Sequence, residues 1–483
     1  MAFQSFEYVL GFLPILLGLY LIVRRSRVLS TLVLVIGSGI FYAWKTVWWL
    51  APLVVAATVD YFVGVKMSSD TTDDRVRRRW LILSLVVNLS LLSAFKYLGW
   101  LTLSLNSLAG LFGLTAVIPV ISTTLPPGIS FYTFETMSYT IDVYRRHFKP
   151  ERSYLIYLNF VLFFPHLVAG PILRPGDLIG QLKVVRPVAT PDEVRLALCQ
   201  ILWGLFKKIA LADNFGDIVG YAVHAVYTPP FDSGGVGLLY AVGFALQIYC
   251  DFSAYSDIAR GSALLFGIKL PRNFLTPLFA KSPREFWTRW HITLSTWIRD
   301  YVYIPLGGNK GTLTKQCTTM IVTMGLGGLW HGAGLMFIAW GLYHGALILI
   351  YRLRPIEAVI TKSEAGLRAV AVGSVFFGLN LFGWMMFRAG SGHPSELGKM
   401  LLTFTAFRHP LDLGAFLHGA GPLALLASIL FATELFAYKR NTEFPEVLCG
   451  LRTIPLATVL TCLWFFAIIF AKRSGYDFIY FAF

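Results

Sequence analysis

Charge is scarce in this sequence. Of its 483 residues, 14% are Asp, Glu, Lys or Arg, whereas a soluble protein of ordinary composition carries about 25%. Apolar side chains make up 56% of the chain, and several apolar runs approach or exceed the roughly 20 residues that cross hydrocarbon as a helix. The composition excludes an ordinary soluble domain. It predicts an all-α, polytopic membrane bundle.

Cysteine is rare, and the common catalytic signatures are missing. The five cysteines include no CxxC pair and no metal-ligand spacing, so we expect neither a disulfide nor a metal site. The sequence has no GxSxG elbow, no GxxxxGK loop, no GxGxxG after a strand and no HExxH. These absences leave an ATP-driven pump and the corresponding soluble enzyme classes without support. We expect no permanently bound cofactor.

The basic residues lie mainly in short loops between apolar runs. The net charge of +15 therefore indicates the positive-inside pattern of membrane proteins, not nucleic-acid binding. The positions of the basic loops predict that the first span begins outside and that the C-terminus lies outside. Lys472 and Arg473 favour the opposite side for the tail. The predicted cytosolic loops are 24–27, 73–79, 144–149, 351–354 and 438–440.

Twelve apolar segments are candidate spans, which gives about 11 or 12 crossings with additional re-entrant helices. We predict an integral membrane domain over 1–471 and an extracytoplasmic tail over 472–483. The 319–350 segment is too long for one straight span, so we expect two segments broken near its glycines. In region 145–235 the prolines and glycines favour re-entrant pieces over clean crossings, and the number of spans there is left open. The candidate spans are 8–23, 28–43, 46–65, 80–104, 128–143, 154–170, 197–213, 236–265, 319–350, 366–386, 422–437 and 454–471.

A histidine stands in the middle of one apolar segment. The stretch GLGGLWHGAG, 325–334, places His331 among glycines that permit close approach, with Trp330 as a flat wall. A structural histidine bonded to a backbone carbonyl is one interpretation. In a membrane span a polar side chain more often lines a path or cavity, and a neutral imidazole can take a proton from a hydroxyl. We therefore predict catalysis at His331, with Trp330, Gly328 and Gly332 lining a tunnel.

A second stretch mixes basic and aromatic residues. It runs from Pro283 to Gly311 and includes His291, 40 residues before His331. One interpretation is an interfacial amphipathic segment with an aromatic belt. The other is a cytosolic funnel for an anionic donor. The basic residues that would bind this donor are Arg284, Arg289, Arg299 and Lys310.

Several acidic residues lie within apolar segments and need partners there. Asp251 and Asp257 fit two roles equally well: an internal polar network with Ser253, Tyr255 and a nearby arginine, or the lining of a reaction tunnel. For Glu135, His166 and Arg174 we expect structural roles.

These stretches together resemble the membrane-bound O-acyltransferase superfamily, and within it the bacterial alginate O-acetyltransferase branch. The similarity covers roughly 1–400 and the last few residues. Its most specific part is EFWTRWHITLSTWIRDYVYIPLGGNKG followed by GGLWHGAG. Other matching motifs are LPPGISFYTFETMSYTIDVYR, FPHLVAGPILR, YCDFSAYSDIARG and GWMMFRA.

The resemblance implies a helical ring around a tunnel in the bacterial inner membrane. The donor would be cytosolic acetyl-CoA, and the acceptor a hydroxyl of an exported polysaccharide such as alginate, reached with an extracytoplasmic partner protein. The essential histidine of the family falls on His331 and its second polar position on His291. His331 follows Lys315 by 16 residues, about 24 Å of helix, which places it deep in a bilayer whose hydrocarbon is about 30 Å thick. Membrane lipid would surround the protein.

Alternatives remain within and outside this family. The acceptor could be peptidoglycan, teichoic acid, a lipid or a protein. A proton-coupled transporter with His331 and Asp257 as a relay is a reading from another class.

The last residues, DFIYFAF, resemble the terminus of this branch and of small partner peptides in related teichoic-acid systems. One interpretation is an aromatic belt that anchors the tail. The other is a relay in which His331 deprotonates Tyr480, the tyrosine takes the acetyl group, and a partner acetyltransferase receives it outside.

Overall fold

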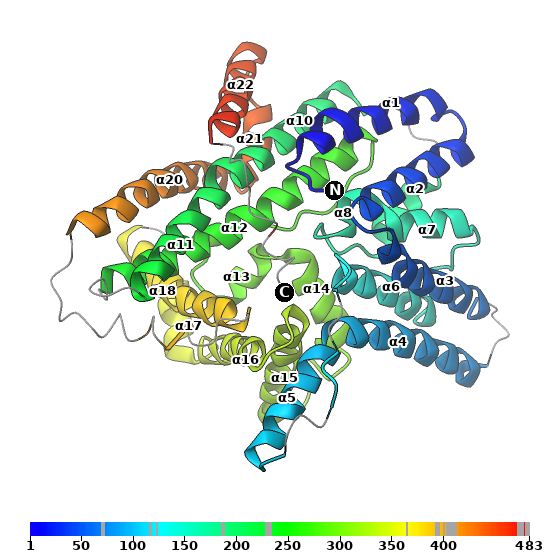
Figure 1. Ribbon diagram of the computed structural model, residues 1–483, viewed down its shortest axis with the longest axis horizontal. Helices are drawn as coiled ribbons and strands as arrows, with labels where there is room; N and C mark the ends of the chain where they lie inside the picture. Colours follow the sequence, from blue (N-terminus) through cyan, green and yellow to red (C-terminus); the bar gives the residue numbers. More distant parts are fainter. Residues whose placement is uncertain are drawn as a thin grey trace. The chain divides into compact units, whose positions relative to one another are not determined.

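The structure, a computed structural model, describes residues 1–68, 73–114, 118–121, 124–184, 189–227, 234–363, 366–391, 397–398, 401, 413–470 and 478. Over these residues the secondary structure is helical, without a strand, which confirms the predicted fold class (Figure 1). The chain divides into two compact units. The first comprises 1–198 and 258–271, and the second comprises 199–257 and 272–483.

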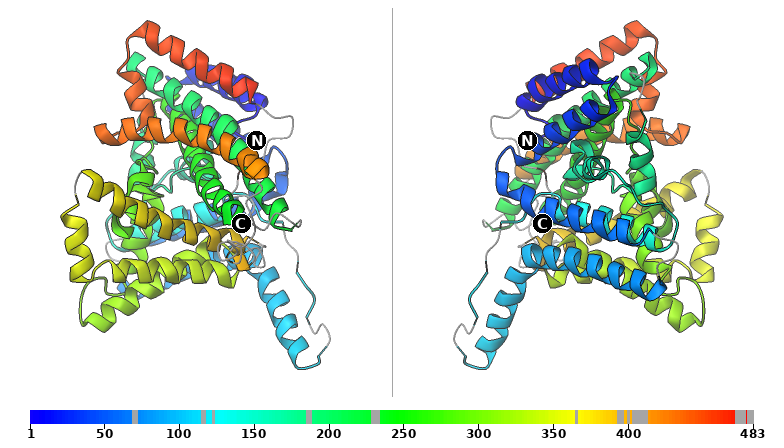
Figure 2. Two further views of the ribbon diagram at one scale, coloured as in Figure 1. Left: turned by 90° about the vertical axis from the view of Figure 1, so that its left-hand side faces the viewer. Right: turned by 90° about the vertical axis from the view of Figure 1, so that its right-hand side faces the viewer.

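The first unit is a bundle of apolar helices. Polar side chains join its helices α3, α4 and α6, because Asn88 donates to Asp60 (2.7 Å) and accepts from Thr136 (2.8 Å). In Figure 2, α5 extends away from α4 and α6. The elements are η1 (Glu7–Phe12), α1 (Leu13–Val23), α2 (Arg27–Ala43), η2 (Val47–Trp49), α3 (Leu50–Lys66), α4 (Asp74–Lys96), α5 (Leu98–Leu111), α6 (Ile129–Tyr144), α7 (Tyr154–Leu162), α8 (Phe164–Leu167), α9 (Pro175–Leu182) and the first half of α10 (Pro191–Phe206).

The second unit holds the motifs that carry the predicted chemistry. Its elements are η3 (Lys207–Ala212), α11 (Asp213–Tyr227), most of α12 (Gly234–Leu265), η4 (Pro277–Phe279), α13 (Pro283–Arg289), α14 (Ile292–Ile298), η5 (Arg299–Tyr303), α15 (Leu313–His331), α16 (Leu335–Ile350), α17 (Arg354–Thr361), α18 (Gly366–Gly390), α20 (Leu413–Arg440), α21 (Phe444–Cys449) and α22 (Thr453–Ile469).

Helices α15 and α16 form the hairpin on which His331 lies (Figure 1). Glycines let the two helices approach backbone to backbone, as small residues do in membrane helix pairs. A methyl group on Gly328 would collide with the carbonyl oxygen of Phe337, and one on Gly341 would collide with the carbonyl oxygen of Met324. The predicted break in 319–350 is present, between His331 and Leu335.

Other predicted spans differ in length from the helices. Five described helices are long and apolar enough to cross a membrane, and the bent pair of α16 and α17 is a possible sixth. The predicted span 80–104 is divided between α4 and α5 at Tyr97. The predicted span 154–170 is divided at Phe163, because Pro165 has no N–H for a continuing helix and instead occupies the first turn of α8.

Candidate active site

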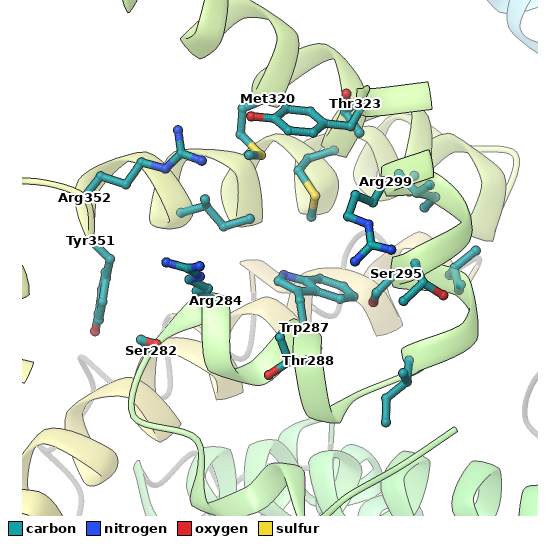
Figure 3. A pocket seen from close by; sticks show the side chains of 18 of the residues that line it. Ser282, Arg284, Trp287, Thr288, Ser295, Arg299, Met320, Thr323, Tyr351 and Arg352 are labelled. Atoms are coloured by element: carbon teal, nitrogen blue, oxygen red, sulfur yellow. The ribbon is translucent and has the colours of Figure 1, made fainter. Parts of the chain in front are cut away.

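A cavity of about 790 Å³ lies in the second unit, between α13, α14, η5, α15, α16 and α17. Figure 3 shows arginine, tyrosine and tryptophan side chains directed toward it. The lining combines cations, hydroxyls and apolar groups, which suits a ligand with charged and uncharged parts. It includes Arg284, Trp287, Ser295, Arg299, Met320, Thr323, Met324, Gly327, His331, Trp340, Tyr351, Arg352 and Glu357.

His331 is the titratable imidazole of this cavity. It is the last residue of α15 and only 5% exposed. Its ring contacts the rings of Trp330 (4.9 Å), Trp340 (5.0 Å) and Phe387 (5.2 Å). The surrounding aromatic rings restrict both the position of the imidazole and the access of water. A histidine held in this way can accept a proton from a hydroxyl that enters the cavity.

The four predicted donor-binding cations are in three different settings. Arg284 and Arg299 line the cavity, and Arg299 also pairs with Asp300 (2.7 Å). Arg289 is absent from the lining, since its guanidinium is engaged with Glu285 (3.0 Å) and the carbonyl oxygen of Leu275 (3.2 Å). Lys310 is exposed in the loop after η5 and does not line the cavity.

The sequence interpretation missed Arg352. This residue, just after α16, lines the cavity beside Tyr351, and the described residues provide no ion pair for it or for Arg284. Glu357 is the carboxylate in the same lining. In the sequence, 351–354 served only as evidence for the cytosolic side. The same mixture of basic and aromatic residues that identified 283–311 could have identified this stretch.

His291 lies behind the cavity wall. It is fully buried and precedes α14 in a left-handed backbone conformation (φ 43°). Its Nδ1 lies 3.2 Å from Oδ1 of Asn273, an oxygen that also accepts from the Thr293 hydroxyl (2.9 Å). A proton on Nδ1 satisfies this contact and fixes the tautomer in which Nε2 carries no proton. Burial lowers the pKa of His291 to about 3.

One tryptophan connects the two histidines. The Trp330 ring lies 4.9 Å from the His331 ring and 6.1 Å from the His291 ring. Trp330, Gly328 and Gly332 were predicted to line the tunnel, but none belongs to the cavity lining. Gly328 serves the contact between α15 and α16, and a methyl group on Gly332 would collide with the Phe337 ring. Gly327 is the glycine of this motif that lines the cavity.

Asp251 and Asp257 form a buried network with lysines. Lys207 contacts Asp257 (2.7 Å) and donates to Ser253 (2.7 Å). Lys208 lies between Asp251 (2.8 Å) and Asp213 (2.9 Å). The structure thus brings both acids into the polar-network arrangement, and the cation is lysine where an arginine was expected. Neither acid lines the cavity.

The other polar residues of the motifs belong to the first unit. His166 Nδ1 lies 2.9 Å from Glu135, which also accepts from the Leu173 N–H (3.1 Å). Arg174 precedes α9, where its N–H donates to Asp177 (2.8 Å). These contacts agree with the expected structural roles. Among the described residues no group of three or more His, Cys, Asp or Glu side chains is placed to hold a metal ion.

The predicted acyl carrier Tyr480 lies outside the described residues. Phe478 is the described residue of the tail 472–483, and it is 4% exposed. Its ring contacts Tyr255 (4.8 Å) and Phe252 (5.9 Å) of α12, and the Phe252 ring also contacts His291 (4.7 Å). Phe478 therefore contacts the same aromatic cluster as the second histidine.

Comparison with known proteins gives a consistent result. Residues 46–387 match the membrane-bound O-acyltransferase family. The chain is 39% identical to "Probable alginate O-acetylase AlgI" of Azotobacter vinelandii over 80% of this chain and 75% of that protein. It is 32% identical to "Peptidoglycan O-acetyltransferase" of Helicobacter pylori over 80% and 77%. It is also 30% identical to "Teichoic acid D-alanyltransferase" of Bacillus subtilis, over 46% and 58%.

Proposed function

Because this chain belongs to the membrane-bound O-acyltransferase family and is an O-acyltransferase, we propose that it moves acetyl groups from cytosolic acetyl-CoA to hydroxyls of an exported polysaccharide. The bacterial inner membrane is the proposed location. The observation that carries the proposal is a buried histidine, His331, in the wall of a cavity that is also lined by Arg284 and Arg352, for which the described residues provide no ion pair.

The cavity suits a nucleotide thioester. Guanidinium groups pair well with phosphates, and Arg284 and Arg352 have no acidic partner among the described residues to compete for them. Trp287, Met320 and Met324 supply apolar surface for the uncharged arm of the donor. The acetyl thioester would then lie beside His331.

In the proposed reaction, His331 removes the proton from the acceptor hydroxyl. The hydroxyl oxygen attacks the thioester carbonyl and forms the new ester bond, while the carbon–sulfur bond breaks. The CoA thiolate leaves and takes up the proton from the imidazolium. His291 would help to orient the donor indirectly, because its ring contacts Trp330 and the Trp330 ring contacts His331, which lines the cavity.

The first acceptor would be Tyr480. Phe478 precedes Tyr480 by two residues, and its ring packs against Phe252, whose ring also contacts His291. This contact supports the proposal that the tail reaches the site. The tyrosine hydroxyl would attack the thioester, and its acetyl ester would pass to an extracytoplasmic partner. Replacing Tyr480 with Phe keeps the ring and should abolish polymer acetylation. Mass spectrometry of the wild-type C-terminal peptide should find acetyl on Tyr480. Normal acetylation by Tyr480→Phe would leave the tail an anchoring role only.

The decisive experiment uses purified protein and acetyl-labelled acetyl-CoA. We expect CoA release and transfer of label by the wild type, and loss of both in a folded His331→Ala variant. Full activity of His331→Ala would contradict the proposed base. Proton-coupled uptake of an anionic solute without CoA release would support the transporter.

Peptidoglycan is the second candidate acceptor, because the similarity to the relative named "Peptidoglycan O-acetyltransferase" extends over 80% of this chain. In cells that make both polymers, ester-linked acetate should appear on the exopolysaccharide and vanish with His331→Ala. Acetate on muramyl residues alone would favour the peptidoglycan reading.

A further inference from the structure

Thr323 has a buried hydroxyl without a hydrogen-bond partner. Its side chain is 3% exposed, lines the cavity, and its Oγ1 makes no hydrogen bond to any described residue. A threonine inside a helix ordinarily donates to the carbonyl oxygen three or four residues earlier. A buried hydroxyl that makes no hydrogen bond lowers the stability of the fold, unless a bound ligand supplies the missing partner.

The other threonines of the lining make the ordinary bond. Each donates its hydroxyl to a carbonyl oxygen of its own helix: Thr288 to Glu285 (2.7 Å), Thr296 to Thr293 (3.0 Å) and Thr361 to Glu357 (2.9 Å). Among the described threonines of the cavity, Thr323 therefore offers the hydroxyl that a ligand can use.

The position of Thr323 indicates which part of the donor would lie beside its hydroxyl. It precedes His331 by eight residues on α15, about 12 Å along the helix axis. Between them the lining is apolar, with Met324 and Gly327. Figure 3 shows Thr323 and Met320 on one wall, and Trp287 on the wall that faces them. A donor whose thioester lies at His331 would pass Thr323 before its phosphates meet the arginines.

We infer that Thr323 binds the outer amide of the pantetheine arm, an inference that rests on the proposed donor being acetyl-CoA. The inner amide is separated from the sulfur by only two methylene groups, so it stays close to His331. The outer amide lies one β-alanine unit further along the arm. An amide donates a hydrogen bond through its N–H and accepts one at its carbonyl oxygen. A threonine hydroxyl can accept from the N–H or donate to the oxygen.

The test compares Thr323→Val with the wild type on three donors: acetyl-CoA, S-acetylpantetheine and S-acetyl-N-acetylcysteamine. The last keeps the inner amide and lacks the outer one. The KM of Thr323→Val should rise about 3- to 10-fold for the first two donors, as the loss of one hydrogen bond predicts. The KM for S-acetyl-N-acetylcysteamine should not change.

Two further variants separate binding from packing. Thr323→Ser retains the hydroxyl and should keep the wild-type KM. Thr319 lies one turn earlier on α15, is also buried and does not line the cavity, so Thr319→Val should leave all three KM values unchanged. An equal rise for all donors, or no rise for any, would overturn the inference. If the wild type does not turn over acetyl-CoA, the proposed function fails and the inference falls with it.

Discussion

At the scale of single residues, His291 combines complete burial with a left-handed backbone. Burial lowers its pKa to about 3, whereas an unfolded histidine titrates near 6.5. Between these values the unfolded chain binds a proton that the folded chain does not. The free energy of unfolding is therefore not reduced by this group above about pH 6.5. It decreases as the pH falls below that value, by about 2 kcal/mol at pH 5.

Thermal unfolding in detergent at pH 7.5 and pH 5 measures this effect. Asn tolerates the left-handed conformation, so His291→Asn keeps the backbone and removes the titration. The decrease in Tm on acidification should be smaller in His291→Asn than in the wild type. An identical decrease in both proteins would show that His291 does not carry this pH dependence.

Arg352 and Arg289 provide a second comparison between single residues. Arg352 lines the cavity, whereas Arg289 is engaged with Glu285 and the backbone. Arg352→Gln should raise the KM for acetyl-CoA about tenfold, since it removes one charged hydrogen-bond partner of the phosphates, and should weaken the salt dependence of KM. Arg289→Gln should lower Tm with little change in KM. The reverse pattern would place the donor phosphates elsewhere.

At the scale of elements, the α15–α16 hairpin depends on glycine. Gly328→Ala would place a methyl group against the carbonyl oxygen of Phe337, and overpacking of this kind costs about 1 to 3 kcal/mol. Gly378→Ala in α18 is the matched control, because a methyl group there would meet nothing within 4 Å. We expect a lower Tm and reduced activity for Gly328→Ala and an unchanged or higher Tm for Gly378→Ala. Equal effects would argue against backbone contact as the reason for Gly328.

At the scale of the whole molecule, orientation in the membrane decides which substrate meets which face. The basic loops predict a cytosolic Lys310 and an external Lys45, and both side chains are exposed. In a cysteine-free background, Lys310→Cys should react with an impermeant maleimide only in inside-out vesicles. Lys45→Cys should react only in right-side-out vesicles. Labelling of Lys310→Cys from outside would contradict the predicted orientation and the cytosolic position of the donor site.

Local sequence patterns predicted the helical fold because apolar runs and basic loops are properties of neighbouring residues. They also predicted a break near the glycines of 319–350 and drew attention to His331, since glycines around a histidine are unusual in an apolar segment. The family resemblance rested on short contiguous motifs for the same reason.

Contacts between distant residues could not be obtained in this way. Lys208 and Asp251 are 43 positions apart, and only the packing of their helices makes them an ion pair. Likewise Arg284 and Arg289 belong to one short helix, yet the first lines the cavity and the second does not. The sequence determined a helical membrane O-acyltransferase with His331 at a helix break. The tertiary structure alone decided which cations and hydroxyls share its cavity, because that depends on which helix faces meet.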